Sequence, residues 1–140
     1  MTTSDITLVK ETFHRVVPIA DQLAPLFYAR LFELDPQLRS LFAGDMAEQG
    51  RTLINVVALT VAALERPTVI VTLLHDLAGR QLGPGTKEEH YLTVGTAWMW
   101  TLEKGLGPDF TPAVHAAWTS VFTYVIHTLV QAQREGVVAA

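Results

Sequence analysis

One polar side chain interrupts an apolar helix face in the middle of this sequence, and its amide needs a partner. Gln81 lies four residues after Leu77 and eleven after Ile70, with Leu73 and Leu74 on the same face. This spacing predicts that Gln81 points inward. Because burying an amide without a partner costs roughly 1–3 kcal/mol, we expect it to meet a hydrogen-bond partner, a water or a ligand.

Histidines are the other side chains whose chemistry could define a site. The five are His14, His75, His90, His115 and His127. Each lies about one position away from the apolar stripe of its stretch, so we interpret each as a solvated or boundary residue. No two are four residues apart, as a metal-binding helix would require. The sequence also lacks a G-x-S-x-G motif and a P-loop, and its carboxylates lie near predicted helix ends, so we predict no catalytic residue.

The elements that position these groups are predicted to be helices throughout. Apolar residues recur at intervals of three and four in every long stretch, and alternation with a period of two does not persist. We therefore predict an all-α fold with about six or seven helices and short connections. The first stripe is Ile6, Val9, Phe13, Val16 and Val17, and the second is Ile19, Leu23, Leu26, Phe27, Leu31 and Leu34.

Several helix ends are marked by capping residues or prolines. We expect Ser4 with Asp5 to cap the first helix, and Pro25 to kink the second helix or mark its effective start. Asp35, followed by proline, predicts a short helical turn. Gly83-Pro84-Gly85 should end the helix that carries Gln81, and a capping box, T-x-x-E at 86–89, should begin the next.

Composition indicates one compact domain, 1–140, in which 49 % of the residues are hydrophobic and 17 % are charged. A net charge of -4 without a basic run predicts neither a nucleic acid nor an anionic membrane as partner. The chain has no cysteine, and its start lacks the apolar core of a signal peptide. We expect a cytoplasmic protein.

Four segments carry a resemblance to a known family. They are LFYARLFELDPQLRSLF at 26–42, EQGRTL at 48–53, LAGRQLGPGTKEEHYLTVG at 77–95 and AAWTSVF at 116–122. In order and spacing they resemble the bacterial single-domain globins of the Vitreoscilla haemoglobin type, whose fold also forms the haem domain of flavohaemoglobins. The resemblance covers nearly the whole chain. It implies a globin fold of six to eight helices around a central haem-type pocket, with haem b as the cofactor.

The resemblance also implies which residues line the pocket. The distal tyrosine, glutamine and leucine of the family match Tyr28, Gln49 and Leu53. Phe42 matches the phenylalanine that packs on the haem, and Tyr91 matches a tyrosine near the proximal side. A phenol and an amide beside one open coordination position can hydrogen-bond dioxygen and stabilise its partial negative charge. Dioxygen or nitric oxide is therefore the implied ligand.

The proximal side departs from the family. Where these globins carry the iron-ligating histidine, in a segment usually reading G-R-R-H, this chain has Gln81, and a carboxamide oxygen is a weak ligand of iron. A family glutamate that forms a relay with that histidine is matched by Gln133. His75 lies roughly 120 degrees around the helix from Gln81, so it reaches the same pocket only if the segment unwinds or slips register.

Two classes of function remain open. The first is a haem-binding globin with atypical or weak proximal ligation at Gln81, and a secondary peroxidase-like or nitric-oxide-oxidising activity would need a redox partner to supply electrons. The alternative is a haem-free globin fold that acts as a sensor, a small-ligand binder or an interaction module. Gln81 can also simply hydrogen-bond Gln133 or a water in a packed core. The sequence leaves the oligomeric state open, including a homodimer.

Overall fold

Every element in the part of the chain that the computed structural model describes, residues 2–41, 46–66, 68–73 and 88–134, is helical. In chain order these are α1 (Thr3–Val16), the 3-10 turn η1 (Val17–Ile19), α2 (Ala20–Leu34), the 3-10 turn η2 (Pro36–Leu41), α3 (Met46–Ala63), α5 (Glu88–Leu106), η3 (Gly107–Asp109) and α6 (Pro112–Arg134). Residues 68–73 are helical as well. The predicted all-α class is confirmed.

The cap of α1 differs from the prediction. Thr2, rather than Ser4, is the capping residue, because its hydroxyl accepts a hydrogen bond from the backbone N–H of Asp5 at 3.1 Å. Asp5 Oδ2 accepts one in return from the backbone N–H of Thr2 at 3.0 Å. This reciprocal capping box satisfies two donors that would otherwise lack a helical partner, and Ser4 lies inside the helix.

The prolines act in two different ways. Pro18 lies just after the end of α1 at Val16, where the chain passes into the 3-10 turn η1. Pro25 does not mark the start of α2, which begins at Ala20 and continues through the proline. Asp35 caps the next turn as predicted, with its Oδ1 accepting from the backbone N–H of Gln37 at 3.1 Å.

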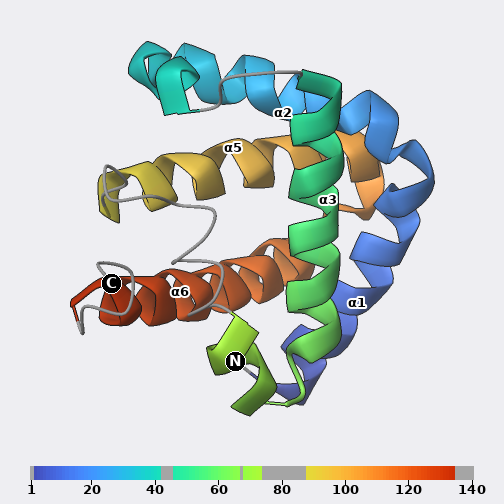
Figure 1. Ribbon diagram of the computed structural model, residues 1–140. Coiled ribbons are helices and arrows are strands. Elements are labelled where there is room, and N and C mark those ends of the chain that lie inside the picture. The colour runs from blue at the N-terminus through green and yellow to red at the C-terminus, as the bar shows by residue number, and fades with distance from the viewer. Residues whose placement is uncertain (1, 42–45, 67, 74–87, 135–140) are drawn as a thin grey trace.

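The helices pack in two main pairs, α1 against α6 and α2 against α5, while α3 contacts α2 and α1 (Figure 1). In the view of Figure 1, α2, α5 and α6 are stacked from top to bottom, and α3 runs across them. A buried hydrogen bond from Trp118 Nε1 to Thr12 Oγ1, 2.8 Å long, joins α6 to α1. Such a bond satisfies an indole N–H that would otherwise be costly to bury.

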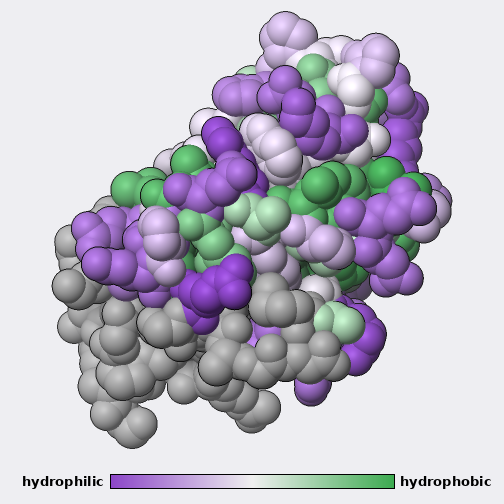
Figure 2. All heavy atoms as spheres, turned by 90° about the horizontal axis from the view of Figure 1, so that it is seen from above, coloured by the Kyte–Doolittle hydropathy of each residue, from purple (hydrophilic) through white to green (hydrophobic). Residues whose placement is uncertain are grey.

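The core follows the predicted apolar stripes with three exceptions. Val9, Phe13 and Val16 on α1 and Leu23, Phe27 and Leu31 on α2 are buried, together with residues of α5 and α6. Val17, Leu26 and Leu34, which were also expected inside, are 45 %, 41 % and 40 % exposed. From the side on which α2 lies, hydrophobic side chains form patches between hydrophilic ones (Figure 2).

The longest helix of the described residues, α6, contains a long apolar segment. Within α6, the segment Pro112–Gln131 is long and apolar enough, by length and composition alone, to cross a membrane. It nevertheless contributes Val114, Trp118 and Val121 to the core, where each is at most 4 % exposed. Packing of this kind is typical of the central helix of a globular domain.

Candidate functional site

The best-defined polar group among the expected site residues is the hydroxyl of Tyr28. Tyr28 lies in the middle of α2, and its side chain is 4 % exposed. Its Oη donates a hydrogen bond to the backbone carbonyl oxygen of Gln49 at 3.0 Å. Because Gln49 belongs to the first turns of α3, this bond ties α2 to α3 at the point where the two expected distal residues meet.

A glycine makes this contact between the two helices geometrically accessible. Gly50 follows Gln49, and a Cβ atom built on it would lie 2.9 Å from Ala24 Cβ on α2. Real Cβ atoms do not approach so closely, so the helices can be this near each other only with glycine at that position. The small pair Ala24 and Gly50 therefore brings the backbone of α3 within reach of the Tyr28 hydroxyl.

Burial sets the protonation state of this phenol. Removal from water disfavours the charged phenolate and raises the pKa of Tyr28 from its ordinary value of 10.0 to about 12. Tyr28 consequently stays a neutral hydrogen-bond donor even in alkaline solution, well above the physiological pH range.

Two other expected residues lie in the same part of the fold. Gln49 is half-buried, and so is Leu53, which lies one helical turn further along α3 and packs against the core. Residues four apart share a helix face, so Gln49 and Leu53 point to the same side of α3. Tyr91 on α5 is 4 % exposed and belongs to the same hydrophobic core as Tyr28.

The remaining expected residues cannot be placed. Phe42, Gln81 and His75 lie outside the described residues, as does the predicted turn at 83–85 with the capping box after it. Gln133 belongs to the last turn of α6, but its side chain also lies outside what the structure describes.

The histidines in the described part of the chain occupy the solvated or boundary positions that were predicted. His14, His115 and His127 are exposed, and His90 is half-buried. Within residues 2–41, 46–66, 68–73 and 88–134, no group of three or more histidine, aspartate or glutamate side chains is arranged to hold a metal ion.

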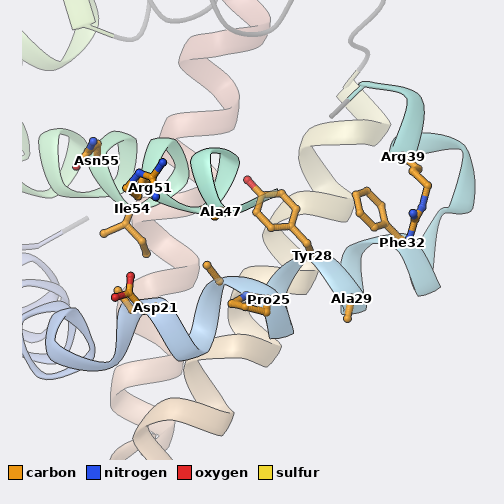
Figure 3. A pocket seen from close by; sticks show the side chains of 13 residues that line it. Asp21, Pro25, Tyr28, Ala29, Phe32, Arg39, Ala47, Arg51, Ile54 and Asn55 are labelled. Carbon is orange, nitrogen blue, oxygen red and sulfur yellow. The ribbon is translucent and has the colours of Figure 1, made fainter. Parts of the chain in front are cut away.

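A groove beside Tyr28 was not predicted. It has a volume of about 920 Å³ and lies between α2, η2 and α3, with Tyr28 and Phe32 on one wall and Arg51 and Ile54 on the other (Figure 3). Its lining combines residues from three elements, so no single stretch of the sequence predicts it. The small residues Ala20 and Ala24, one turn apart on α2, are the local signal that could have indicated close approach of another helix.

These elements define an all-α protein in which α2 and α3 cross closely at a buried, hydrogen-bonded tyrosine. The chain belongs to the globin family, whose model, described as Globin, matches residues 26–129. The predicted globin fold is thereby confirmed. The matched range includes Tyr28, Gln49, Leu53 and Tyr91.

The curated relatives that the chain matches include flavohemoproteins. It is 30 % identical over 139 residues to the flavohemoprotein of Xylella fastidiosa strain 9a5c, covering 94 % of this chain and 34 % of that protein. It is 26 % identical over 140 residues to the flavohemoprotein of Vibrio cholerae serotype O1, covering 97 % of this chain and 35 % of that protein. The chain thus spans about a third of the length of these relatives.

Proposed function

We propose that this protein is a haem-binding globin that takes up a diatomic gas, dioxygen or nitric oxide, beside Tyr28, Gln49 and Leu53. The observation that carries the proposal is the buried Tyr28 hydroxyl held at the first turns of α3. Membership of the globin family and similarity to proteins named flavohemoproteins support haem as the cofactor. We propose haem b as its type.

The described residues fit the apolar body of a haem. Leu53 and Val57 on α3 and Val94 on α5 are half-buried against the core, so each retains apolar surface that a macrocycle can cover. At roughly 25 cal/mol per Å², covering such surface holds a large flat group without any axial bond. Haem iron supplies an open coordination position for a gas.

Tyr28 supplies the polar side of that site. Its hydroxyl is protonated at neutral pH, and it can donate to a bound acceptor in exchange for the Gln49 carbonyl oxygen that accepts its hydrogen bond in the structure. The half-buried side chain of Gln49 provides an amide on the same side of α3 as Leu53. Together these groups favour a ligand that carries partial negative charge.

On the other side, we propose atypical or weak axial ligation. Gln81 occupies the position that corresponds to the ligating histidine in the Vitreoscilla-type pattern, and the described residues supply no fully buried imidazole. An amide oxygen binds iron more weakly than an imidazole nitrogen does. We also propose a redox partner as the source of any electrons.

One observation favours the second candidate, a haem-free globin that serves as a sensor, a small-ligand binder or an interaction module. The donor of Tyr28 is already satisfied by the Gln49 carbonyl, so the buried phenol requires no bound ligand to be stable. The two candidates differ in whether the purified protein takes up haem.

The test is a haem titration of the purified apoprotein, followed by absorption spectra, beside two variants. Gln81→His restores an imidazole at the ligand position and should sharpen the Soret band and tighten haem binding. Gln22→His adds an imidazole at an exposed position on α2 and serves as the matched control, which should behave like the natural protein.

Stoichiometric haem uptake by the natural protein, with carbon monoxide binding after reduction, is the result we expect. Uptake by Gln81→His alone would instead assign the natural protein to the haem-free class. Equal behaviour of Gln81→His and Gln22→His would contradict a proximal role for position 81.

A further inference from the structure

A row of aromatic rings crosses the core from α2 to α1. The ring centroids of Tyr28 and Phe27 are 5.0 Å apart, and that of Phe27 lies 6.2 Å from that of Trp98 on α5. The centroid of Trp98 lies 5.9 Å from that of Trp118 on α6, which in turn lies 6.5 Å from that of Phe13 on α1. All five side chains belong to one core and are at most 6 % exposed. Rings packed edge to face in this way leave no water between them, so the row joins four helices across short gaps.

Two members of this row, Trp98 and Trp118, can give up an electron while keeping their protons. Oxidation of an indole yields a cation radical, whereas a phenol has to release its proton when it is oxidised. The hydroxyl of Tyr28 donates to the backbone carbonyl oxygen of Gln49, and a peptide carbonyl is too weakly basic to take up that proton. The two phenylalanine rings are much harder to oxidise than an indole. An oxidising equivalent in this row is therefore expected on one of the two tryptophans.

The two indole N–H groups have different surroundings. Nε1 of Trp118 donates a hydrogen bond to Thr12 Oγ1 at 2.8 Å, and the Thr12 hydroxyl donates in turn to the backbone carbonyl oxygen of Leu8 at 2.7 Å. Nε1 of Trp98 is buried, and no described residue accepts a hydrogen bond from it. A hydrogen bond to the charged form of a group favours that form, whereas burial without a partner disfavours it. The cation radical is therefore more stable on Trp118 than on Trp98.

The third tryptophan, Trp100, is disfavoured as a site of oxidation by its charged neighbours. It is half-buried on α5, and the guanidinium carbon of Arg30 lies 5.4 Å from its ring centroid. The ammonium nitrogen of Lys104 lies 5.5 Å from the same centroid. Positive charges this close to a ring attract its electrons and oppose the formation of another positive charge there. Trp100 therefore serves as an internal control for the two buried tryptophans.

We propose that Trp98 and Trp118 form a buried electron relay, in which a strong one-electron oxidant beside Tyr28 takes an electron from Trp98 and Trp118 replaces it. The oxidising equivalent then resides on Trp118. Only an electron moves in each step, so no bond forms or breaks, and the oxidant is reduced by one electron. The indole proton of Trp118 stays in its hydrogen bond to Thr12. The relay goes beyond the proposed gas binding and requires no haem.

Flash photolysis of the haem-free protein with an attached photo-oxidant tests the relay. The chain has no cysteine, so Ala29→Cys, at an exposed position of α2 next to Tyr28, gives a single attachment point for a ruthenium polypyridyl complex. A light pulse in the presence of an electron acceptor converts the complex to Ru(III), and transient absorption then follows the indole radical. We expect the radical to form in the labelled protein with its helical circular dichroism retained. Absence of an indole radical would overturn the proposal.

Three variants of the labelled protein locate the electron transfer. Trp98→Phe should slow formation of the radical several-fold, because the nearest remaining indole of the row is then one ring further from the label. Thr12→Val removes the acceptor of the Trp118 N–H and should lower the yield of the radical several-fold. Trp100→Phe is the matched control and should change neither the rate nor the yield.

Each variant has an outcome that contradicts the relay. An unchanged rate in Trp98→Phe would overturn the transfer through that residue, and an unchanged yield in Thr12→Val would overturn Trp118 as the final site. Loss of the signal in Trp100→Phe would assign the radical to the half-buried indole instead. Because Thr12→Val changes no ring, it tests the proposal even where Trp98→Phe prevents folding.

Discussion

The phenol of Tyr28 is buried where water cannot stabilise its anion, and this has a measurable effect on stability at high pH. Its pKa is about 12 in the folded protein and 10.0 in the unfolded chain. Between these values the unfolded chain has lost the proton and the folded protein still holds it. The folded state therefore binds more protons, and the free energy of unfolding falls as pH rises through this window.

We expect Tyr28→Phe to reduce that dependence. In the natural protein, the phenol contributes up to about 2–3 kcal/mol of stability that is lost between about pH 10 and pH 12. The variant also loses the hydrogen bond to Gln49, which costs about 0.5–1.5 kcal/mol at neutral pH. Urea unfolding at a series of alkaline pH values measures both effects. An identical pH dependence in the two proteins would contradict the burial of this hydroxyl.

At the scale of the elements, Gly95 on α5 lies directly against Phe122 on α6. A Cβ atom built on Gly95 would lie 2.1 Å from Cε1 of Phe122, which means that the aromatic ring packs directly on the glycine. Gly95→Ala should destabilise the protein by about 1–3 kcal/mol through overpacking, since its better helix propensity offsets at most about 1 kcal/mol. Chemical denaturation measures the change.

The matched variant removes the ring that the new methyl group would meet. Phe122→Leu alone should lower the free energy of unfolding. In the Gly95→Ala background the same change should lower it by less, because it relieves the clash with the new methyl group. A double-mutant cycle isolates this coupling, which we expect to be at least about 0.5 kcal/mol. Strict additivity of the two changes would show that α5 and α6 do not pack through this pair.

Helical periodicity predicted the elements well and their exposed edges poorly. At 100° per residue, Leu26 lies 60° from Leu23, at the margin of the α2 stripe, and Leu34 is the last residue of its helix. Val17 falls in a 3-10 turn, where the period of three no longer matches the stripe of α1. A pattern tells which residues share a face, but neighbouring elements decide how far along that face burial extends.

At the scale of the whole molecule, we expect residues 1–140 to unfold as one cooperative unit. Buried residues of α1, α2, α5 and α6 belong to one continuous hydrophobic core, which also contains Trp98 and Trp118. Tryptophan fluorescence and far-ultraviolet circular dichroism should therefore report superimposable unfolding curves in urea. Separate midpoints would indicate that part of the chain folds independently.

The candidate site was predictable only in part, for reasons of distance along the chain. Tyr28, Gln49 and Leu53 were found by resemblance, and the bond between Tyr28 and Gln49 joins residues 21 positions apart. The groove is formed where three elements meet, so its volume depends on packing that no local pattern encodes. Thr12 as the acceptor for Trp118, 106 positions away, escaped prediction for the same reason.

The hydrogen bond between Tyr28 and the Gln49 carbonyl makes ligand recognition an exchange. A phenol has a single proton to donate, and here it is already committed to an acceptor 3.0 Å away. A ligand beside Tyr28 obtains that proton only by leaving the carbonyl with one partner fewer. The binding free energy that the ligand obtains from Tyr28 is therefore the difference between the new hydrogen bond and the one to Gln49. A ligand with a strongly negative acceptor atom forms a stronger hydrogen bond with Tyr28 than the carbonyl does, whereas a weak acceptor such as carbon monoxide does not. The contact that joins α2 to α3 therefore also sets the minimum polarity of a ligand that Tyr28 can select.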